Sequence, residues 1–206
     1  MTGDRNEFLI HIYDQMFNDI NRHIMVVWQS VGVMVSALAF YALVEKEIVS
    51  LDVAVALMVL LAAWLVAHLI DAGYWYNRNI AIIANIERQF LEPEDLHKVH
   101  YYFGVHRPKN RMISHLKIQV ALGIGLVILV IGHHASIRVI PGFGSPFSNF
   151  EIQRALPYAL FVLAAAYLYH LKNDRDKSYA EFLENSPGLP VDTTGIRYGI
   201  GHGFKG

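Results

Sequence analysis

Residues 24–44 read IMVVWQSVGVMVSALAFYALV and contain no charged side chain over 21 positions. Because an α-helix rises about 1.5 Å per residue, this run is long enough to cross a hydrocarbon core of roughly 30 Å. A second uncharged run, VAVALMVLLAAWLVAHLI, occupies residues 53–70, and only the short polar stretch from Glu45 to Asp52 separates the two. The sequence therefore predicts a helical hairpin in a membrane.

Two further apolar runs occupy residues 116–132 and 155–171. Lys117 lies at the edge of the first run, where its stem can follow the apolar face while the ammonium reaches headgroups. Pro157 lies near the start of the second run, where the first turn of a helix tolerates proline. Buried helices of a soluble protein are the alternative, but they would show polar faces at helical period, and these runs do not. We expect four spans.

The composition agrees with a lipid environment. The chain has 54% apolar and only 17% charged residues, whereas soluble domains have about a quarter charged residues. A net charge of -1 argues against nucleic acid as a partner. The absence of cysteine excludes disulfides, cysteine nucleophiles and thiolate metal sites. No nucleotide-binding, dinucleotide-binding or hydrolase motif is present, so we expect no cofactor.

The distribution of Lys and Arg predicts the orientation. Only Lys46, Arg138 and Arg154 lie in the segments between spans one and two and between spans three and four. The other basic residues lie in the arm 1–23, the central segment 71–115, the edge of the third span and the tail 172–206. Because cytoplasmic segments retain positive charge, we expect a multi-pass membrane protein with both termini cytoplasmic. The loop 133–154 is then extracytoplasmic, and His133 and His134 are interpreted as an interfacial polar step.

Both helices of the hairpin are expected to continue into the cytoplasm. Apolar residues recur every three or four positions in the arm, and no Pro or Gly interrupts residues 4–31. A similar stripe follows the second span and ends at Pro93. The two stripes should pair. The predicted fold is all-α, an integral membrane four-helix transmembrane bundle with cytoplasmic extensions of helices 1 and 2.

Polar and small residues inside the spans are candidates for an interior face. Polar groups are costly in hydrocarbon, so five of them should face protein or water: Gln29, Ser30, Ser36, His68 and Gln119. They could line a pore that His68 gates, or they could form interhelical hydrogen bonds that only fix packing. Close helix packing is expected at Gly32, Ser36, Gly123 and Gly125.

The central segment carries two further candidate sites. Arg107, Lys109 and Arg111 are expected to attract lipid phosphate. Four histidines of the same segment, His97, His100, His106 and His115, could hold zinc or iron, although helix capping is the more ordinary role of such residues.

The segments Trp75-Tyr76-Asn77-Arg78-Asn79 to Ile86-Glu87-Arg88-Gln89-Phe90 and Arg22-His23 to Trp28-Gln29 resemble small bacterial conflict-system membrane proteins. These are the SLATT-type effectors and the four-span accessory proteins of type VI CRISPR loci. The resemblance covers residues 4–91 and implies a homo-oligomeric, multi-pass component of the bacterial inner membrane that perturbs or permeabilises this membrane when a cytosolic partner signals infection. Docking of that partner is expected at Trp75, Asn77, Arg78, Ile82, Ile86 and Phe90. A membrane-bound metal-dependent enzyme and a passive membrane scaffold are the alternatives.

Overall fold

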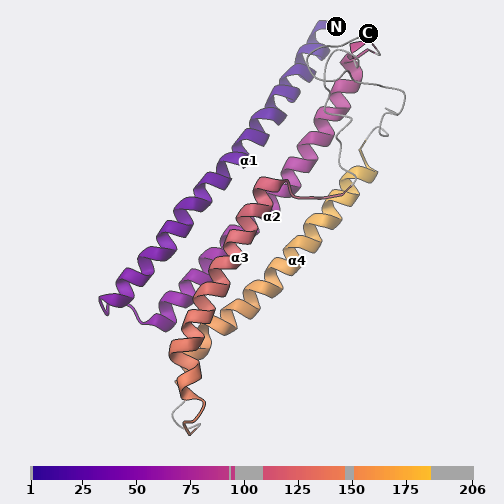
Figure 1. Ribbon diagram of the computed structural model, residues 1–206. Coiled ribbons are helices and arrows are strands. Elements are labelled where there is room, and N and C mark those ends of the chain that lie inside the picture. Colours follow the sequence, from indigo (N-terminus) through magenta and orange to yellow (C-terminus); the bar gives the residue numbers. More distant parts are fainter. Residues whose placement is uncertain (1, 93, 96–108, 147–150, 187–206) are drawn as a thin grey trace, which may run out of the picture. The chain divides into compact units, whose positions relative to one another are not determined.

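The computed structural model describes residues 2–92, 94–95, 109–146 and 151–186, and of residues 2–3, 26–27 and 29–31 it describes only the backbone. Every regular element in these ranges is helical (Figure 1). The elements are α1 (Thr2–Glu45), α2 (Leu51–Phe90), α3 (Ser114–His134), the π-helical turn η3 (Ala135–Val139), the 3₁₀ turns η4 (Ile140–Gly142) and η6 (Ile152–Ala155), and α4 (Leu156–Glu184). The prediction of an all-α chain is confirmed for this part of the protein.

The helices of the hairpin have the predicted lengths. Helix α1 is unbroken over 44 residues, as expected from the absence of Pro and Gly between residues 4 and 31. Helix α2 runs for 40 residues and ends at Phe90, shortly before Pro93. The tight connection between them includes Glu47, whose φ of 55° lies in the left-handed region.

Helix α4 extends beyond the fourth apolar run. It continues to Glu184, because the charged run 172–177 contains no Gly or Pro, and charge alone does not end a helix. The membrane boundaries expected at residues 155 and 171 stay predictions, as does the extracytoplasmic position of the segment 133–154. This segment contains the turns η3, η4 and η6, which begin directly after His134 and lead into α4.

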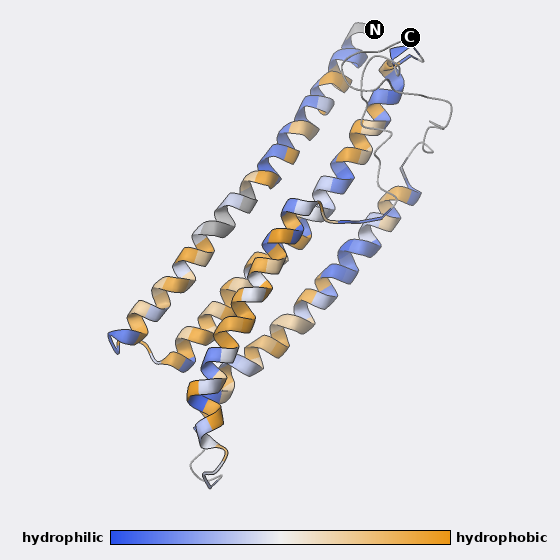
Figure 2. Cartoon of the chain, in the orientation of Figure 1, coloured by the Kyte–Doolittle hydropathy of each residue, from blue (hydrophilic) through white to orange (hydrophobic). Residues whose placement is uncertain are grey.

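The chain divides into two compact units. Unit 1 comprises Met1–His23, Tyr74–Arg111 and Asp176–Gly206, and unit 2 comprises Ile24–Gly73 and Met112–Arg175. Within the described ranges, three helical stretches are long and apolar enough to cross a membrane, namely Leu51–Phe90, Ser114–Gly142 and Ile152–Glu184, and Gly32–Glu45 is a shorter apolar helix. Figure 2 shows the hydrophobic residues of α3 and of the first half of α4, and the hydrophilic residues of α4 after Leu171.

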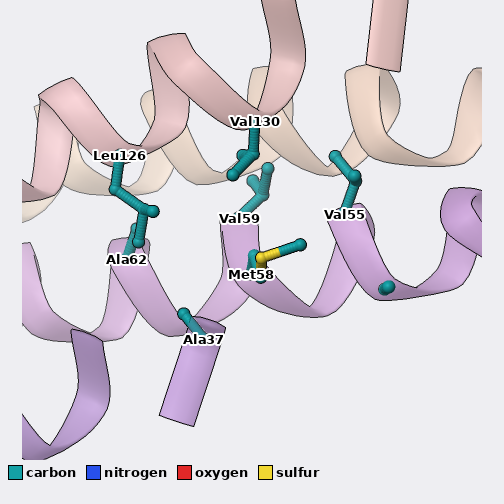
Figure 3. Packing of buried hydrophobic residues seen from close by; sticks show 8 residues of the cluster. Ala37, Val55, Met58, Val59, Ala62, Leu126 and Val130 are labelled. Carbon is teal, nitrogen blue, oxygen red and sulfur yellow. The ribbon is translucent and has the colours of Figure 1, made fainter. Parts of the chain in front are cut away.

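The core of unit 2 is built from α1, α2 and α3. Met58 and Val59 of α2 are buried, and Leu126 and Val130 of α3 pack against α2 (Figure 3). Ala37 of α1 completes this cluster. A second cluster joins α2 to α3 and consists of Leu65, Leu69, Ala72 and Leu116. This apolar core fixes the first half of α2 against α3, and therefore fixes the helix ends that carry the site described below.

Unit 1 has its own small core. Ile20 of α1 packs with Ile80 and Ile83 of α2, and all three are buried. Tyr13 donates a hydrogen bond from its hydroxyl to Glu87 Oε1 at 3.3 Å. The pairing of the two amphipathic stripes is therefore confirmed, and it arises from side chains spaced three or four residues apart on each helix.

Candidate functional site

Asp52 lies in the first turn of α2 and is the buried anion of unit 2, with only 1% of the residue exposed. Ser50 precedes this turn, and its hydroxyl oxygen accepts a hydrogen bond from the backbone N–H of Val53 at 3.3 Å. A carboxylate near a helix N-terminus gains from the helix dipole. Burial of an unpaired carboxylate would cost several kcal/mol, on the order of the Born penalty after relaxation, so the partners of Asp52 decide whether it can stay ionised.

His134 and Arg138 supply these partners from the end of α3 and the π-helical turn. His134 is fully buried, and its Nε2 lies 2.8 Å from Asp52 Oδ1. Arg138 donates from Nε to Oδ1 at 3.1 Å and from Nη2 to Oδ2 at 3.0 Å, which is a bidentate pair. The widened turn Ala135–Val139 brings both side chains to one carboxylate. Turns of this kind are frequent at functional sites.

Tyr158 extends this network to a cavity. Its hydroxyl lies 3.0 Å from His134 Nδ1, and it is held in the first turn of α4. An ionised Asp52 can only accept, so His134 donates from Nε2, and in the neutral imidazole Nδ1 then accepts from the Tyr158 hydroxyl. Three helix ends are thus joined by one hydrogen-bonded chain from Tyr158 through His134 to Asp52.

The cavity has a volume of about 710 Å³ and is lined by Arg138, Arg154, Glu151 and Tyr158 among apolar residues. Glu151 accepts from Arg138 Nη2 at 2.8 Å and from Arg154 Nη2 at 2.7 Å. The hydrogen bond from Arg154 is the main cause that holds the pKa of Glu151 below its ordinary value. Two carboxylates and two guanidinium groups make the network neutral when His134 is neutral.

This arrangement can orient the Tyr158 hydroxyl and hold an oxyanion beside two guanidinium groups. The buried residues that follow Asp52 on α2, Ala54, Val55 and Met58, are apolar. The ring of His134 is buried inside the protein, and the position of His133 and His134 at the membrane interface stays a prediction. The available signal was the four-residue spacing of His134 and Arg138 together with a lone acid at the start of an apolar helix.

The predicted interior polar residues do not share one environment. Ser36 is exposed in the single chain, and its hydroxyl donates to the carbonyl of Gly32 at 2.9 Å, so the helix itself satisfies this group, and an interior position stays a prediction. His68 packs edge-on against Trp64 in a cavity of about 520 Å³ between α2 and α4. Gln119 is half-buried. The side chains of Gln29 and Ser30 lie outside the described residues.

The predicted packing glycines differ from one another. A Cβ built at Gly123 would lie 3.2 Å from Val66 Cγ2, so this glycine allows α3 to approach α2 closely. Among the described residues, no side chain or other helix comes within 4 Å of such a Cβ at Gly32 or Gly125. Packing at these two positions and at Ser36 stays a prediction for contact with a second copy of the chain.

The predicted docking residues are partly interior to unit 1. Asn77 and Ile86 are buried, so they hold the unit together and do not offer a docking surface. Asn77 donates to Asn110 Oδ1 at 2.9 Å. Arg78 lies over the rings of Trp75 and Phe182, with centroid distances of 5.1 and 5.5 Å. Phe90 is 40% exposed and Ile82 half-buried, and docking at these positions stays a prediction.

The metal and lipid-phosphate candidates lie largely outside the described residues. His97, His100, His106 and Arg107 belong to the segment that is not described. His115, Lys109 and Arg111 are exposed. Within the described ranges there is no group of three His, Cys, Asp or Glu side chains that could hold a metal ion. Phosphate contact at Lys109 and Arg111 stays a prediction.

The described residues define a helical protein with apolar helices of membrane-spanning length and a hydrogen-bonded network of charged side chains around buried Asp52 at three helix ends. Comparison of the chain with protein-family models, curated proteins and solved structures finds no match.

Proposed function

We propose that the chain is an integral protein of the bacterial inner membrane that crosses the bilayer four times as a four-helix bundle, with both termini in the cytoplasm. In this proposal the protein oligomerises, and a cytosolic partner that binds unit 1 changes the permeability of the membrane, in the setting of antiviral defence.

The exposed apolar surface of unit 2 is the observation that carries the membrane assignment. Of the most apolar window of each helix, 56% is buried in α2, 22% in the α3 stretch and only 6% in the α4 stretch. Large side chains such as Leu129, Leu163 and Tyr167 are more than half exposed, at 62%, 65% and 60%. Monomeric soluble proteins rarely expose contiguous apolar patches of more than a few hundred Å², whereas lipid solvates such a surface without cost.

The tight connection between α1 and α2 supports a fourth span. Lys46–Ser50 alone separates the end of α1 from the start of α2. If α2 enters the bilayer at Leu51, α1 must end on the same side. Since residues 24–44 of α1 carry no charge, the helix can return through the hydrocarbon core.

Helices that belong to both units support the proposed coupling between partner binding at unit 1 and the permeability of the membrane. Helices α1, α2 and α4 each contribute residues to both units. A partner that repacks Ile20 against Ile80 and Ile83 acts on helices whose other ends form unit 2. Rigid helices can carry such a rearrangement as rotation or translation, which is a common mode of switching.

The membrane assignment is tested with a charge on the proposed lipid face. Leu163→Arg should lower the fraction of protein that resists alkaline extraction from membranes, because Arg near the middle of a span costs about 2.5–3.5 kcal/mol in insertion. Glu181→Arg, on the charged part of α4, is the control and should leave that fraction unchanged. In a water-soluble protein the Leu163→Arg variant would be harmless, so equal behaviour of both variants would reject the membrane assignment.

The permeability output is tested separately with the full chain in dye-loaded proteoliposomes. Leakage of the dye should appear when candidate partner proteins, encoded by genes next to that of this chain, are added. The extent of leakage should increase with the oligomeric fraction of the protein, measured by light scattering in detergent. A protein that resists extraction but stays monomeric, with no leakage under any partner condition, would be a passive membrane component and would overturn this part of the proposal.

A further inference from the structure

Glu151 occupies an oxyanion site that two arginines form. Its two carboxylate oxygens accept from Arg154 Nη2 at 2.7 Å and from Arg138 Nη2 at 2.8 Å. The Glu151 side chain is 53% exposed, whereas the side chains of Arg138 and Arg154 are 32% and 23% exposed. The two guanidinium groups that donate are therefore largely enclosed by the protein, while the Glu151 carboxylate that accepts is open to molecules outside it. An oxyanion from outside can compete with this carboxylate for the same two guanidinium groups.

Both arginines are fixed in place by other contacts. Arg138 is anchored by its bidentate pair with buried Asp52, and Arg154 donates from Nη1 to the Arg138 carbonyl at 3.1 Å. The Nε of Arg154 is buried and has no hydrogen-bond partner among the described residues. A buried donor without an acceptor loses its hydrogen bond to water and gains none in return, which favours an additional acceptor at this position.

The walls of the cavity are apolar. Val139, Phe143, Pro146 and Ala155 line the space of about 710 Å³ next to the two guanidinium groups. Phe143, one of these lining residues, is 80% exposed, which is unfavourable in water and favourable at the boundary of acyl chains. A ligand for this cavity should therefore combine an anionic group with an apolar body.

We propose that this cavity binds the phosphate of an anionic phospholipid, with Arg138 and Arg154 as the phosphate ligands and Glu151 as the internal anion that the phosphate displaces. The inference rests on the membrane integration proposed above. Exchange of one anion for another keeps the network neutral, and a phosphodiester offers more acceptor oxygens than the carboxylate, including one for the Arg154 Nε–H. The acyl chains would follow the apolar wall at Val139 and Phe143.

Native mass spectrometry of the full chain in detergent tests the proposal. We expect retention of dioleoyl phosphatidylglycerol at least tenfold stronger than that of dioleoyl phosphatidylcholine. Glu151→Gln should strengthen phosphatidylglycerol binding about threefold or more, since it removes the competing charge. Arg154→Gln should weaken binding by about tenfold or more, the usual loss for one charge-assisted contact, and Arg154→Lys should restore part of it.

Arg175→Gln is the matched control, because Arg175 also pairs with a carboxylate of unit 2, Asp71, at 2.7 Å, but lies outside this cavity. It should bind phosphatidylglycerol like the unchanged chain. Equal retention of the two lipids, or equal effects of Arg154→Gln and Arg175→Gln, would overturn the proposal, and so would full displacement of the lipid by millimolar glycerol phosphate, which would indicate a site for a soluble phosphate.

The two proposals fail in different ways. A chain that alkaline buffer removes from membranes contradicts the membrane assignment. A chain that resists extraction and shows no preference between the two lipids contradicts the headgroup site alone. If Arg154→Gln does not fold, the Glu151→Gln and Arg154→Lys variants still decide the question, because neither removes the positive charge of the site.

Discussion

Asp52 Oδ1 and His134 Nε2 lie 2.8 Å apart, although 82 positions separate the two residues in the chain and both are almost completely buried. Arg138 binds the same carboxylate. These hydrogen bonds to the Asp52 carboxylate connect the start of α2 to the end of α3, next to an apolar core.

Asp52→Asn should strongly destabilise unit 2. The substitution removes the negative charge from a buried group and leaves Arg138 without a charged partner on that side, and breaking a buried pair in this way costs about 3 kcal/mol. Thermal unfolding in detergent measures the effect. Asp71→Asn removes the partner of Arg175 at a site where both side chains are about one third exposed, and should cost less than about 1 kcal/mol. Equal losses would show that the Asp52 network is not a stabilising feature.

Gly123→Leu should destabilise the contact of α2 with α3. The first atom of the new side chain would already lie 3.2 Å from Val66 Cγ2 and 3.7 Å from Leu65 Cδ2, so the helices must separate. Overpacking of this kind costs about 1–3 kcal/mol. Gly125→Leu, where no described side chain or other helix comes within 4 Å, tests the position two residues further and should change stability little in the monomer. A loss at Gly125 in the oligomer alone would place that glycine at an interface between copies.

Ile83→Ala should loosen unit 1, because Ile83 is completely buried against Ile20 and Ile80. Truncation of such a side chain costs about 2–4 kcal/mol. Hydrogen exchange at residues 13–20 and 76–87 should rise, while exchange in the core of unit 2 stays low. Ile10→Ala, at a residue 51% exposed, is the control and should leave exchange unchanged.

Binding of phosphatidylglycerol should strengthen on acidification. Arg154 holds the pKa of Glu151 below its ordinary value of 4.5, so this carboxylate is ionised and competes with the phosphate at neutral pH. It stops competing only when the pH falls below the lowered pKa and the carboxylate is protonated. The lipid phosphodiester stays ionised throughout. Affinity measured by lipid retention should be flat from pH 7 to about 5 and then increase.

The Glu151→Gln variant distinguishes the contribution of Glu151 to this pH dependence from that of the neighbouring groups. Arg138 and Arg154 face Glu151, and Asp52, His134 and Tyr158 lie behind Arg138 in the same network. If Glu151 alone competes with the phosphate, the variant should show no increase at low pH. An increase that persists in Glu151→Gln would have to come from Asp52 or His134.

Hydrophobic periodicity predicted most of the fold. The uncharged runs and the absence of Pro and Gly between residues 4 and 31 were sufficient for the lengths of α1 and α2, because local pattern and helix continuity are properties of neighbouring residues. The continuation of α4 through the charged run 172–177 was not predicted, because this run resembles a polar tail, although none of its residues prevents a helix.

The site could not be predicted in the same way. Asp52, His134 and Tyr158 lie in three segments, and without the three-dimensional packing of α2, α3 and α4 nothing relates their positions. Histidines close in sequence suggested a metal cluster, whereas the ring of His134 is hydrogen-bonded to residues far away in the sequence, Asp52 and Tyr158. Polar residues inside apolar runs were expected in the interior, but Ser36 satisfies its hydroxyl within its own helix.

The π-helical turn Ala135–Val139 has an evolutionary consequence. Such a turn contains one residue more than an α-helical turn, and a single inserted codon is enough to create it. Loss of that codon would rotate the following residues by about 100° around the helix axis, which would carry Arg138 away from Asp52 while His134 stays in place. In homologous chains, a one-residue deletion before Arg138 would therefore abolish both the buried ion pair with Asp52 and the proposed phosphate site.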